Sequence, residues 1–191
     1  NLAFPQNNET FLFLKKISST KINFIGNLKF AENNLNSLDQ FSLKLKSEFS
    51  KKKVWIASST HKSEEIFCAN THIVLKKKVK NLLTIIIPRH VHRALEISNE
   101  LKKINLKFAF HSMRPKNLKS IDIYIVDTFG ETQKFHNIGS SVFLGGSIIN
   151  RGGQNPLEAS RMGAKILHGP NTDNFKDIYK LLKNLNISKK I

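Results

Sequence analysis

The stretch "LLTIII", residues 82–87, decides the fold class of this chain, and "PRH" follows it at 88–90. Strands that face water on one side alternate apolar and polar residues, whereas this run is apolar almost throughout. The stretch "IDIYIV", residues 121–126, has the same character. Continuous apolar runs of this length are typical of parallel strands covered by helices on both faces. The sequence therefore predicts an α/β fold with a Rossmann-like parallel sheet.

Other apolar runs of strand length extend the predicted sheet along the chain. In order, the predicted strands are 22–25, 54–57, 82–87, 106–110, 121–126, 142–144 and 165–167. Segments of helical period alternate with them, and the clear helices are 37–49, 63–77, 92–103 and 174–185. This alternation is the pattern of βα units in a parallel sheet.

Two of these helices carry start signals. Ser37 and Gln40 have the spacing of a capping box, and Ser63 is the expected N-cap of the next helix. Glu64 and Glu65 then fall at the positive end of its dipole. The first helix places apolar residues on one face, namely Leu38, Phe41, Leu45 and Phe49.

The formal net charge of +17 first suggests nucleic acid or an anionic membrane as partner. Most of the positive charge is Lys scattered through every segment, which favours a solvated surface, with attraction of an acidic partner as the alternative. The single cysteine, Cys68, excludes an internal disulfide framework. No apolar run approaches the roughly twenty residues needed to cross a bilayer. The arginines are Arg89, Arg93, Arg114, Arg151 and Arg161.

The polar and glycine-rich stretches all follow predicted strands. They are "SSTHKSEE" at 58–65, "PRH" at 88–90, "DTFGE" at 127–131, "GGSIINRGGQNPLE" at 145–158 and "HGPNTDNF" at 168–175. The carboxyl edge of an open parallel sheet is where ligands bind. We therefore expect the functional site at this edge.

The glycine-rich stretch has two interpretations. Gly152 and Gly153 can bring backbone N–H groups close to a ligand, and Pro156 is preorganised for a helix start that favours an anion such as phosphate. Arg151 could neutralise that anion, and Glu158 could accept bonds from sugar hydroxyls. Alternatively, the glycines only shape a turn and the carboxylate only complements the helix dipole. "DTFGE" is likewise either a ligand-facing loop or a helix cap.

The histidine-containing stretches are less specific. His90 and His92 have a spacing that could bind a metal on a strand, but no third ligand follows in sequence. Arg89, just past a buried strand, suits a phosphate or a carboxylate. Ser59 and His61 lack the flanking glycines of a nucleophile elbow, which favours binding or capping roles over a catalytic pair.

Taken in order, these motifs together with "GNLKF" at 26–30 and "GPNTDNF" at 169–175 resemble the 3-deoxy-D-manno-octulosonic acid (Kdo) transferases. The resemblance implies the C-terminal half of a GT-B glycosyltransferase fold. It also implies transfer of Kdo from CMP-Kdo to a lipid A precursor in lipopolysaccharide biosynthesis, at the cytoplasmic face of the inner membrane. Neither a metal nor another cofactor is implied.

The resemblance also implies which residues contact the CMP part of the donor: Pro88, Arg89, Phe129, Gly130, Glu131, Asn155, Pro156, Leu157 and Glu158. Departures from the family pattern are mild. Phe129 stands where Met is usual and Ser63 replaces a common Gly, while Asn150 and Gln154 occupy places often held by Pro and His. These departures leave the nucleotide class intact.

The family members are longer than this chain, so the resemblance implies a division of the sequence. Residues 1–26 are expected to be the last strand, helix and strand of an N-terminal domain with its linker, and residues 27–191 the CMP-Kdo-binding domain. The membrane anchor, acceptor groove and catalytic glutamate would belong to the absent part, which leaves a soluble fragment without transferase activity. The alternative is a non-catalytic basic module that binds nucleic acid or an anionic membrane surface.

Overall fold

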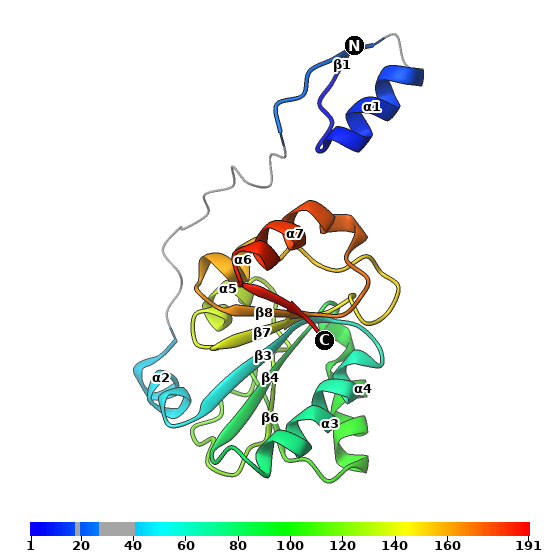
Figure 1. Cartoon of the computed structure of the whole chain (residues 1–191). Coiled ribbons are helices and arrows are strands. Elements are labelled where there is room, and N and C mark those ends of the chain that lie inside the picture. The colour runs from blue at the N-terminus through cyan, green and yellow to red at the C-terminus, as the bar shows by residue number, and fades with distance from the viewer. Residues whose placement is uncertain (18–19, 27–40) are drawn as a thin grey trace. The chain divides into compact units, whose positions relative to one another are not determined.

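The computed structural model describes residues 1–17, 20–26 and 41–191, and it divides into two compact units, Asn1–Ser37 and Leu38–Ile191 (Figure 1). The first unit contains β1 (Leu2–Ala3), α1 (Asn8–Ile17) and β2 (Lys21–Ile22), and its two strands pair in parallel. The predicted Ser37–Gln40 capping box, Leu38 and most of "GNLKF" lie outside the described residues.

The second unit is built on a seven-stranded parallel sheet with the order β5-β6-β4-β3-β7-β8-β9. The predicted α/β class is therefore confirmed. The strands are β3 (Lys53–Thr60), β4 (Leu82–Pro88), β5 (Phe108–Phe110), β6 (Ile123–Ile125), β7 (Ser141–Leu144), β8 (Lys165–His168) and β9 (Ser188–Lys190).

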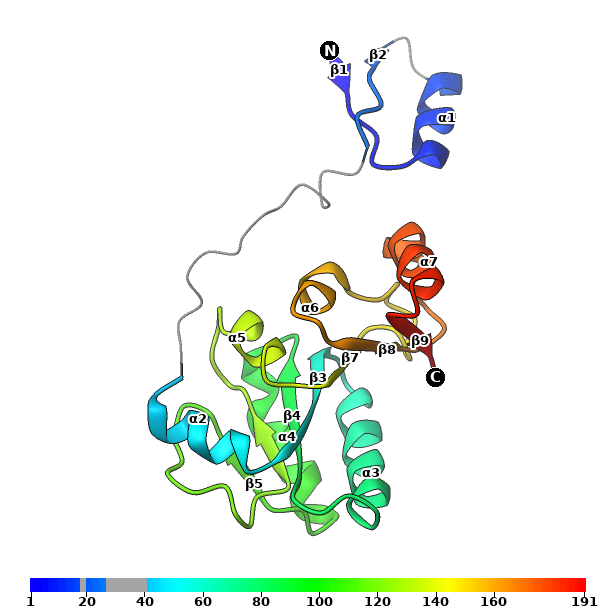
Figure 2. The ribbon, with the colours of Figure 1, turned by 60° about the vertical axis from the view of Figure 1, so that its left-hand side comes forward.

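Helices cover both faces of this sheet (Figure 2), with α3 and α4 on one face and α2, α5, α6 and α7 on the other. Their bounds are α2 (Leu43–Ser50), α3 (Glu64–Lys76), α4 (Ala94–Lys103), α5 (Thr132–His136), α6 (Leu157–Arg161) and α7 (Lys176–Asn184). Short 3-10 turns, Val91–Arg93 and Asp173–Phe175, lead into α4 and α7.

The central strand β4 shows why its sequence is apolar throughout. Leu83, Ile85 and Ile87 belong to the core on the α2 and α7 side, whereas Leu82 and Ile86 belong to the core under α3 and α4. Successive side chains point to opposite faces of a sheet, and here both faces are covered. The alternation therefore separates two cores instead of a core from solvent.

Two features differ from the sequence predictions. The helix expected from residue 37 begins only at Leu43, because Ser42 is its N-cap and its hydroxyl accepts a bond from the N–H of Leu45. Phe41 precedes the helix, and its ring packs against that of Phe135 with centroids 4.9 Å apart. The edge strand β9 was not predicted, since "SKK" has the polar, lysine-rich sequence that protects exposed sheet edges.

We expect Phe135→Ala to lower the free energy of unfolding by roughly 3 to 5 kcal/mol, because a fully buried aromatic ring would leave a cavity. Phe129→Ala is the matched control, since that ring is 80% exposed and its removal should change stability by less than about 0.5 kcal/mol. Urea denaturation of both variants measures the difference. Equal losses would contradict the assigned core.

Candidate functional site

Backbone hydrogen bonds join the chain segments at the ends of β3, β4 and β7, at the carboxyl edge of the sheet. Pro88, the last residue of β4, pairs with Thr60 of β3. The N–H of Arg89 donates to the carbonyl of Thr60 at 2.9 Å, and the N–H of Gly145 donates to the carbonyl of Ser58 at 2.9 Å. The motifs "SSTH", "PRH" and "GGSIIN" therefore meet at one place, as their positions after parallel strands predicted.

A buried carboxylate holds the start of the glycine-rich loop. Glu64 is fully buried, and its Oε2 accepts bonds from the N–H groups of Gly146 at 2.7 Å and His61 at 3.0 Å. Its Oε1 accepts from the N–H groups of Ser147 at 3.2 Å and Ile148 at 3.1 Å. The sequence suggested only a favourable position near the helix dipole. The carboxylate instead joins two loops through four backbone donors.

Ser63 occupies the predicted N-cap position of α3, but it does not cap the helix with its side chain. Its hydroxyl makes no capping bond, and its φ of 76° is left-handed, a conformation that favours glycine. The neighbouring Glu65 is buried and pairs with Arg93 at 2.6 Å. Burial raises the pKa of Glu65, although the Arg93 guanidinium opposes the shift. Both acidic residues of this helix start therefore serve tertiary contacts.

The glycines of "RGGQ" allow a close approach between two loops. A Cβ on Gly152 would lie 2.5 Å from the side chain of Asn174, and one on Gly153 would lie 3.1 Å from the carbonyl oxygen of Asn171. Both glycines also have positive φ, at 76° and 73°. The N–H of Gly153 donates to the carbonyl of Gly146 at 2.9 Å. Gly152 and Gly153 therefore pack against "NTDN" and stabilise the loop itself.

The loop after β8 is fastened to the same turn. The N–H of Asn171 donates to the carbonyl of Ser147 at 2.9 Å, and its side-chain amide donates to the carbonyl of Ile148 at 3.0 Å. The N–H of Gly169 donates to the hydroxyl of Ser147 at 2.9 Å. "HGPNTDNF" therefore supports the same turn of the glycine-rich loop that Glu64 holds.

The "DTFGE" loop forms a second group of polar contacts. Glu131 lies 2.8 Å from Nε2 of His111 and also accepts bonds from Thr128 and Lys134. Burial opposes its charge, but the bonds from Lys134 and Thr128 outweigh burial and lower the pKa of Glu131. His111 and Lys134 were missed in the sequence. The position of His111 directly after the strand 108–110 was the available signal.

The same contacts close one side of a cavity of about 390 Å³, whose lining includes Phe41, His111, Glu131 and Lys134. The tip of the loop is open, because Phe129 is 80% exposed and a Cβ on Gly130 would meet nothing within 4 Å. Glu131 thus anchors the loop, while its preceding residues face solvent.

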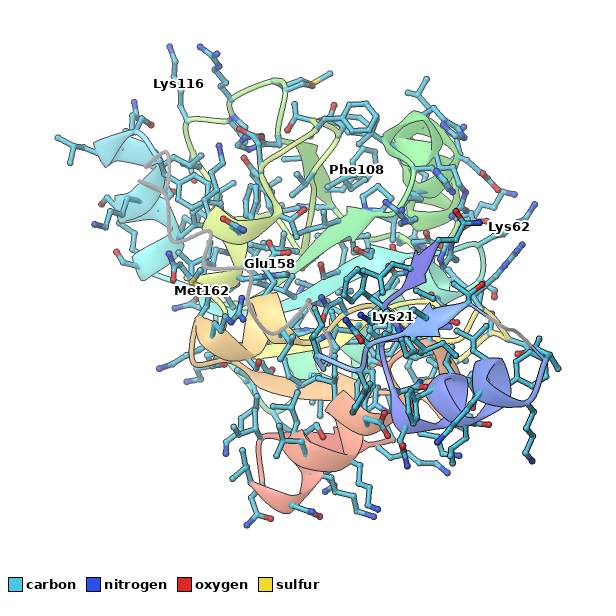
Figure 3. All side chains as sticks on the ribbon, turned by 90° about the horizontal axis from the view of Figure 1, so that it is seen from above. Lys21, Lys62, Phe108, Lys116, Glu158 and Met162 are labelled. Carbon is cyan, nitrogen blue, oxygen red and sulfur yellow. The ribbon has the colours of Figure 1, made fainter. Side chains whose placement is uncertain are left out.

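The helix α6 presents the last group of predicted residues. The side-chain oxygen of Asn155 accepts a bond from the N–H of Leu157 at 3.1 Å. Pro156 and Leu157 are buried, and Leu157 packs in the core, whereas Glu158 is half-buried in the first turn. Figure 3 labels Glu158 on this helix, well separated from Lys62 of the loop after β3. Because α5 packs against α6, the segment after "DTFGE" lies beside the "NPLE" helix.

The histidines of "PRHVH" do not form a metal centre with other ligands. The rings of His90 and His92 stack with centroids 5.6 Å apart. Among residues 1–17, 20–26 and 41–191, no group of three or more His, Cys, Asp or Glu side chains could hold a metal ion. Within the same ranges no helix is long and apolar enough to cross a membrane.

Two related transferases align with most of this chain. It is 32% identical over 166 residues to the 3-deoxy-D-manno-octulosonic acid transferase of Haemophilus influenzae, with 85% of this chain covered. It is 35% identical over 156 residues to that of Rickettsia felis, with 82% covered. This chain belongs to the Kdo transferase family. It spans only 38% and 33% of the length of these two Kdo transferases. No protein-family model matches the chain.

A solved structure shares the fold of most of this chain. The C-terminal CMP-Kdo binding domain of WaaA from Acinetobacter baumannii matches with a TM-score of 0.72 and 25% sequence identity. The match covers 78% of this chain and 78% of that domain. The chain therefore corresponds to the C-terminal part of a Kdo transferase, and its fold is that of the C-terminal GT-B domain.

We expect Glu64→Gln to destabilise this Kdo transferase domain by roughly 3 kcal/mol, because an amide nitrogen would face backbone N–H groups that now donate to a carboxylate. Glu96→Gln is the control. Glu96 is 41% exposed and pairs with Arg93 and Lys62 at the surface, so its loss should matter far less. Denaturant unfolding compares the two. A Glu64→Gln protein as stable as Glu96→Gln would contradict the role of the carboxylate.

The buried His136 makes stability depend on pH. Its Nε2 lies 3.0 Å from the hydroxyl of Ser58, and burial lowers the pKa of His136 from 6.5 to about 4. The imidazole binds a proton more readily in the unfolded state than in the folded state. The contribution of neutral His136 to the free energy of unfolding is therefore fully present above pH 6.5 and is lost as the pH falls towards 4. We expect a loss of roughly 3 kcal/mol from this residue.

The measurement is urea unfolding at several pH values between 7 and 4 for wild type and His136→Gln. Other half-buried histidines, such as His61 and His111, also have lowered pKa values because of burial, so some acid sensitivity will remain in the variant. The slope of stability against pH should nevertheless be smaller in the variant. Parallel curves for the two proteins would refute the assignment.

Proposed function

We propose that this chain is the donor-binding part of a Kdo transferase and holds CMP-Kdo while Kdo is transferred to a lipid A precursor. The observation that carries the proposal is the likeness to the CMP-Kdo binding domain of the Acinetobacter baumannii protein, which extends over 78% of this chain. The positions of "PRH" and "TFGE" after the adjacent strands β4 and β6, and of "NPLE" in the segment after β7, support it. The likeness supports the ligand class, and the sheet topology supports the carboxyl edge as its place.

The contacts to CMP are part of this proposal. Arg89 is exposed, so its guanidinium can reach a phosphate. Asn155 uses its carbonyl oxygen on Leu157, which leaves its NH₂ group for a ligand. The buried Pro156 and Leu157 would line the site, and Pro88 would shape the start of the loop.

The "TFGE" loop would contribute in a different way. Phe129 offers an exposed ring and Gly130 an open backbone, both suited to a nucleobase. Glu131 already has three partners, His111, Thr128 and Lys134. We propose that it holds the loop in place and reaches CMP only by exchanging one of them.

We further propose that residues 1–26 belong to the N-terminal domain of the full protein, which would supply the catalytic glutamate, the acceptor groove and the attachment to the inner membrane. The apolar surface of the first unit supports this proposal. No residue of α1 is buried, and seven large apolar side chains of the described part of this unit are exposed. They are Leu2, Phe4, Leu12, Phe13, Ile17, Phe24 and Ile25.

A non-catalytic basic module was the alternative function. Its support was the net charge of +17, carried mainly by lysines. The family relationship does not favour it, because related transferases account for the motifs as well as for the fold. The charge remains compatible with an anionic membrane surface as an additional partner.

We expect the chain to bind CMP in preference to UMP and AMP. Affinity should be weak, on the order of high micromolar or worse, because a half-site leaves much of the ligand in water. Isothermal calorimetry with the three nucleotides measures it. Equal heats for all three, or no heat at all, would count against the proposed function.

We expect Glu158→Gln to weaken CMP binding about tenfold, roughly 1 to 2 kcal/mol, because a charge-assisted bond to the ribose hydroxyls becomes one between neutral groups. Asp177→Asn is the matched control, since Asp177 also lies in the first turn of a helix. It should leave CMP binding unchanged.

The 2′-deoxy analogue of CMP separates a ribose contact from a dipole effect. Wild type should discriminate against the analogue, and Glu158→Gln should discriminate much less. If wild type bound CMP and 2′-deoxy-CMP equally well, Glu158 would not read the ribose.

A further inference from the structure

Two arginines at the carboxyl edge have no carboxylate partner. Arg89 follows β4 and Arg151 lies in the glycine-rich loop after β7, and both are exposed. Within the described ranges neither forms an ion pair, whereas Arg93 pairs with Glu65 and Glu96. Each therefore presents an uncompensated guanidinium to solvent.

Two histidines lie near these arginines. A Cβ on Gly146 would lie 3.3 Å from the His61 ring and 3.4 Å from Cβ of Arg151, so both side chains flank this glycine. The His61 and His90 rings have centroids 6.1 Å apart, and His90 directly follows Arg89. We call His61, Arg89, His90 and Arg151 the basic rim cluster.

The nearby acidic groups are already engaged. Glu64 is buried and accepts four backbone N–H groups, including that of His61. Glu96 pairs with Arg93 and with Lys62 at 3.4 Å. The pKa of His61 also reflects the positive charge around it. Burial lowers this pKa, and the charges of His90, Arg151 and Arg89 lower it further, while Glu64 opposes the shift.

The proposed donor carries two anionic groups, a phosphodiester and the carboxylate of its sugar acid. We infer that the basic rim cluster binds this sugar carboxylate, with Arg151 as its main partner. The inference rests on the proposed function and deepens it. A phosphodiester carries a single charge that one guanidinium can match, and the second guanidinium with two imidazoles then forms the donor set that a carboxylate prefers. The cluster would thereby select acidic sugars over neutral ones.

The test compares CMP-Kdo with its C1 carboxamide, in which an uncharged group of similar size replaces the carboxylate. Calorimetry uses the chain as it is, in wild-type form and as Arg151→Gln. Lys62→Gln is the control, because it removes one positive charge from the loop after β3 while leaving the cluster intact. Thermal unfolding of each variant shows that it is folded.

Wild type and Lys62→Gln should bind the carboxamide about tenfold more weakly than CMP-Kdo. In Arg151→Gln this ratio should fall below about twofold, while affinity for CMP stays within about threefold of wild type. If wild type binds CMP and both sugar ligands but does not distinguish the last two, the inference is overturned and the proposed function stands. Equal weakening of CMP and CMP-Kdo by Arg151→Gln assigns Arg151 to the phosphate and also overturns it. Absence of binding by all three ligands removes both proposals.

Discussion

The candidate site depends on the hydrogen bonds that the carboxylate of Glu64 accepts. This carboxylate is fully buried and accepts hydrogen bonds from the N–H groups of His61, Gly146, Ser147 and Ile148. A buried carboxylate is costly unless its oxygens are fully bonded, and buried backbone N–H groups carry the same requirement. The carboxylate oxygens and the four backbone N–H groups therefore satisfy one another's hydrogen-bonding requirement. The loop after β3 and the loop after β7 are consequently held in one arrangement.

Other contacts at the carboxyl edge of the sheet add to these four hydrogen bonds. Ser147 and Asn171 attach the loop after β8, and the glycines at 152 and 153 let "NTDN" approach closely. Much of the bare backbone in the glycine-rich stretch is therefore used inside the protein. The groups that we propose for a ligand are the exposed Arg89, His90 and Arg151 and the half-buried His61 of the basic rim cluster, together with the first turn of α6. This separation between supporting and ligand-facing groups is what a preorganised site requires.

The second half of the site is supported by aromatic packing. The rings of Phe41, Phe49, Tyr124 and Phe135 pack together, with centroids 4.9 to 6.2 Å apart for the contacting pairs. His111 joins this cluster and reaches Glu131 at 2.8 Å. The hydrogen bond between His136 and Ser58 ties α5 to β3. The loop tip with Phe129 and Gly130 is exposed, and these packed residues support the rest of the loop.

The sequence by itself determined the parallel sheet, since runs such as 82–87 and 121–126 are apolar because both sheet faces are covered. It also placed the motifs at the carboxyl edge, because position after a strand is a local property. The helix start at Leu43 and the edge strand β9 were missed, as their signals were weak or polar. Only the tertiary structure decided what Glu64, His111 and the glycines at 152 and 153 contact. Glu64 lies more than eighty residues before its partners in the glycine-rich loop, with separations of 82 to 84. A hydrogen bond over such a distance leaves no periodicity in the sequence, because it depends on how β3 and β7 come to lie side by side.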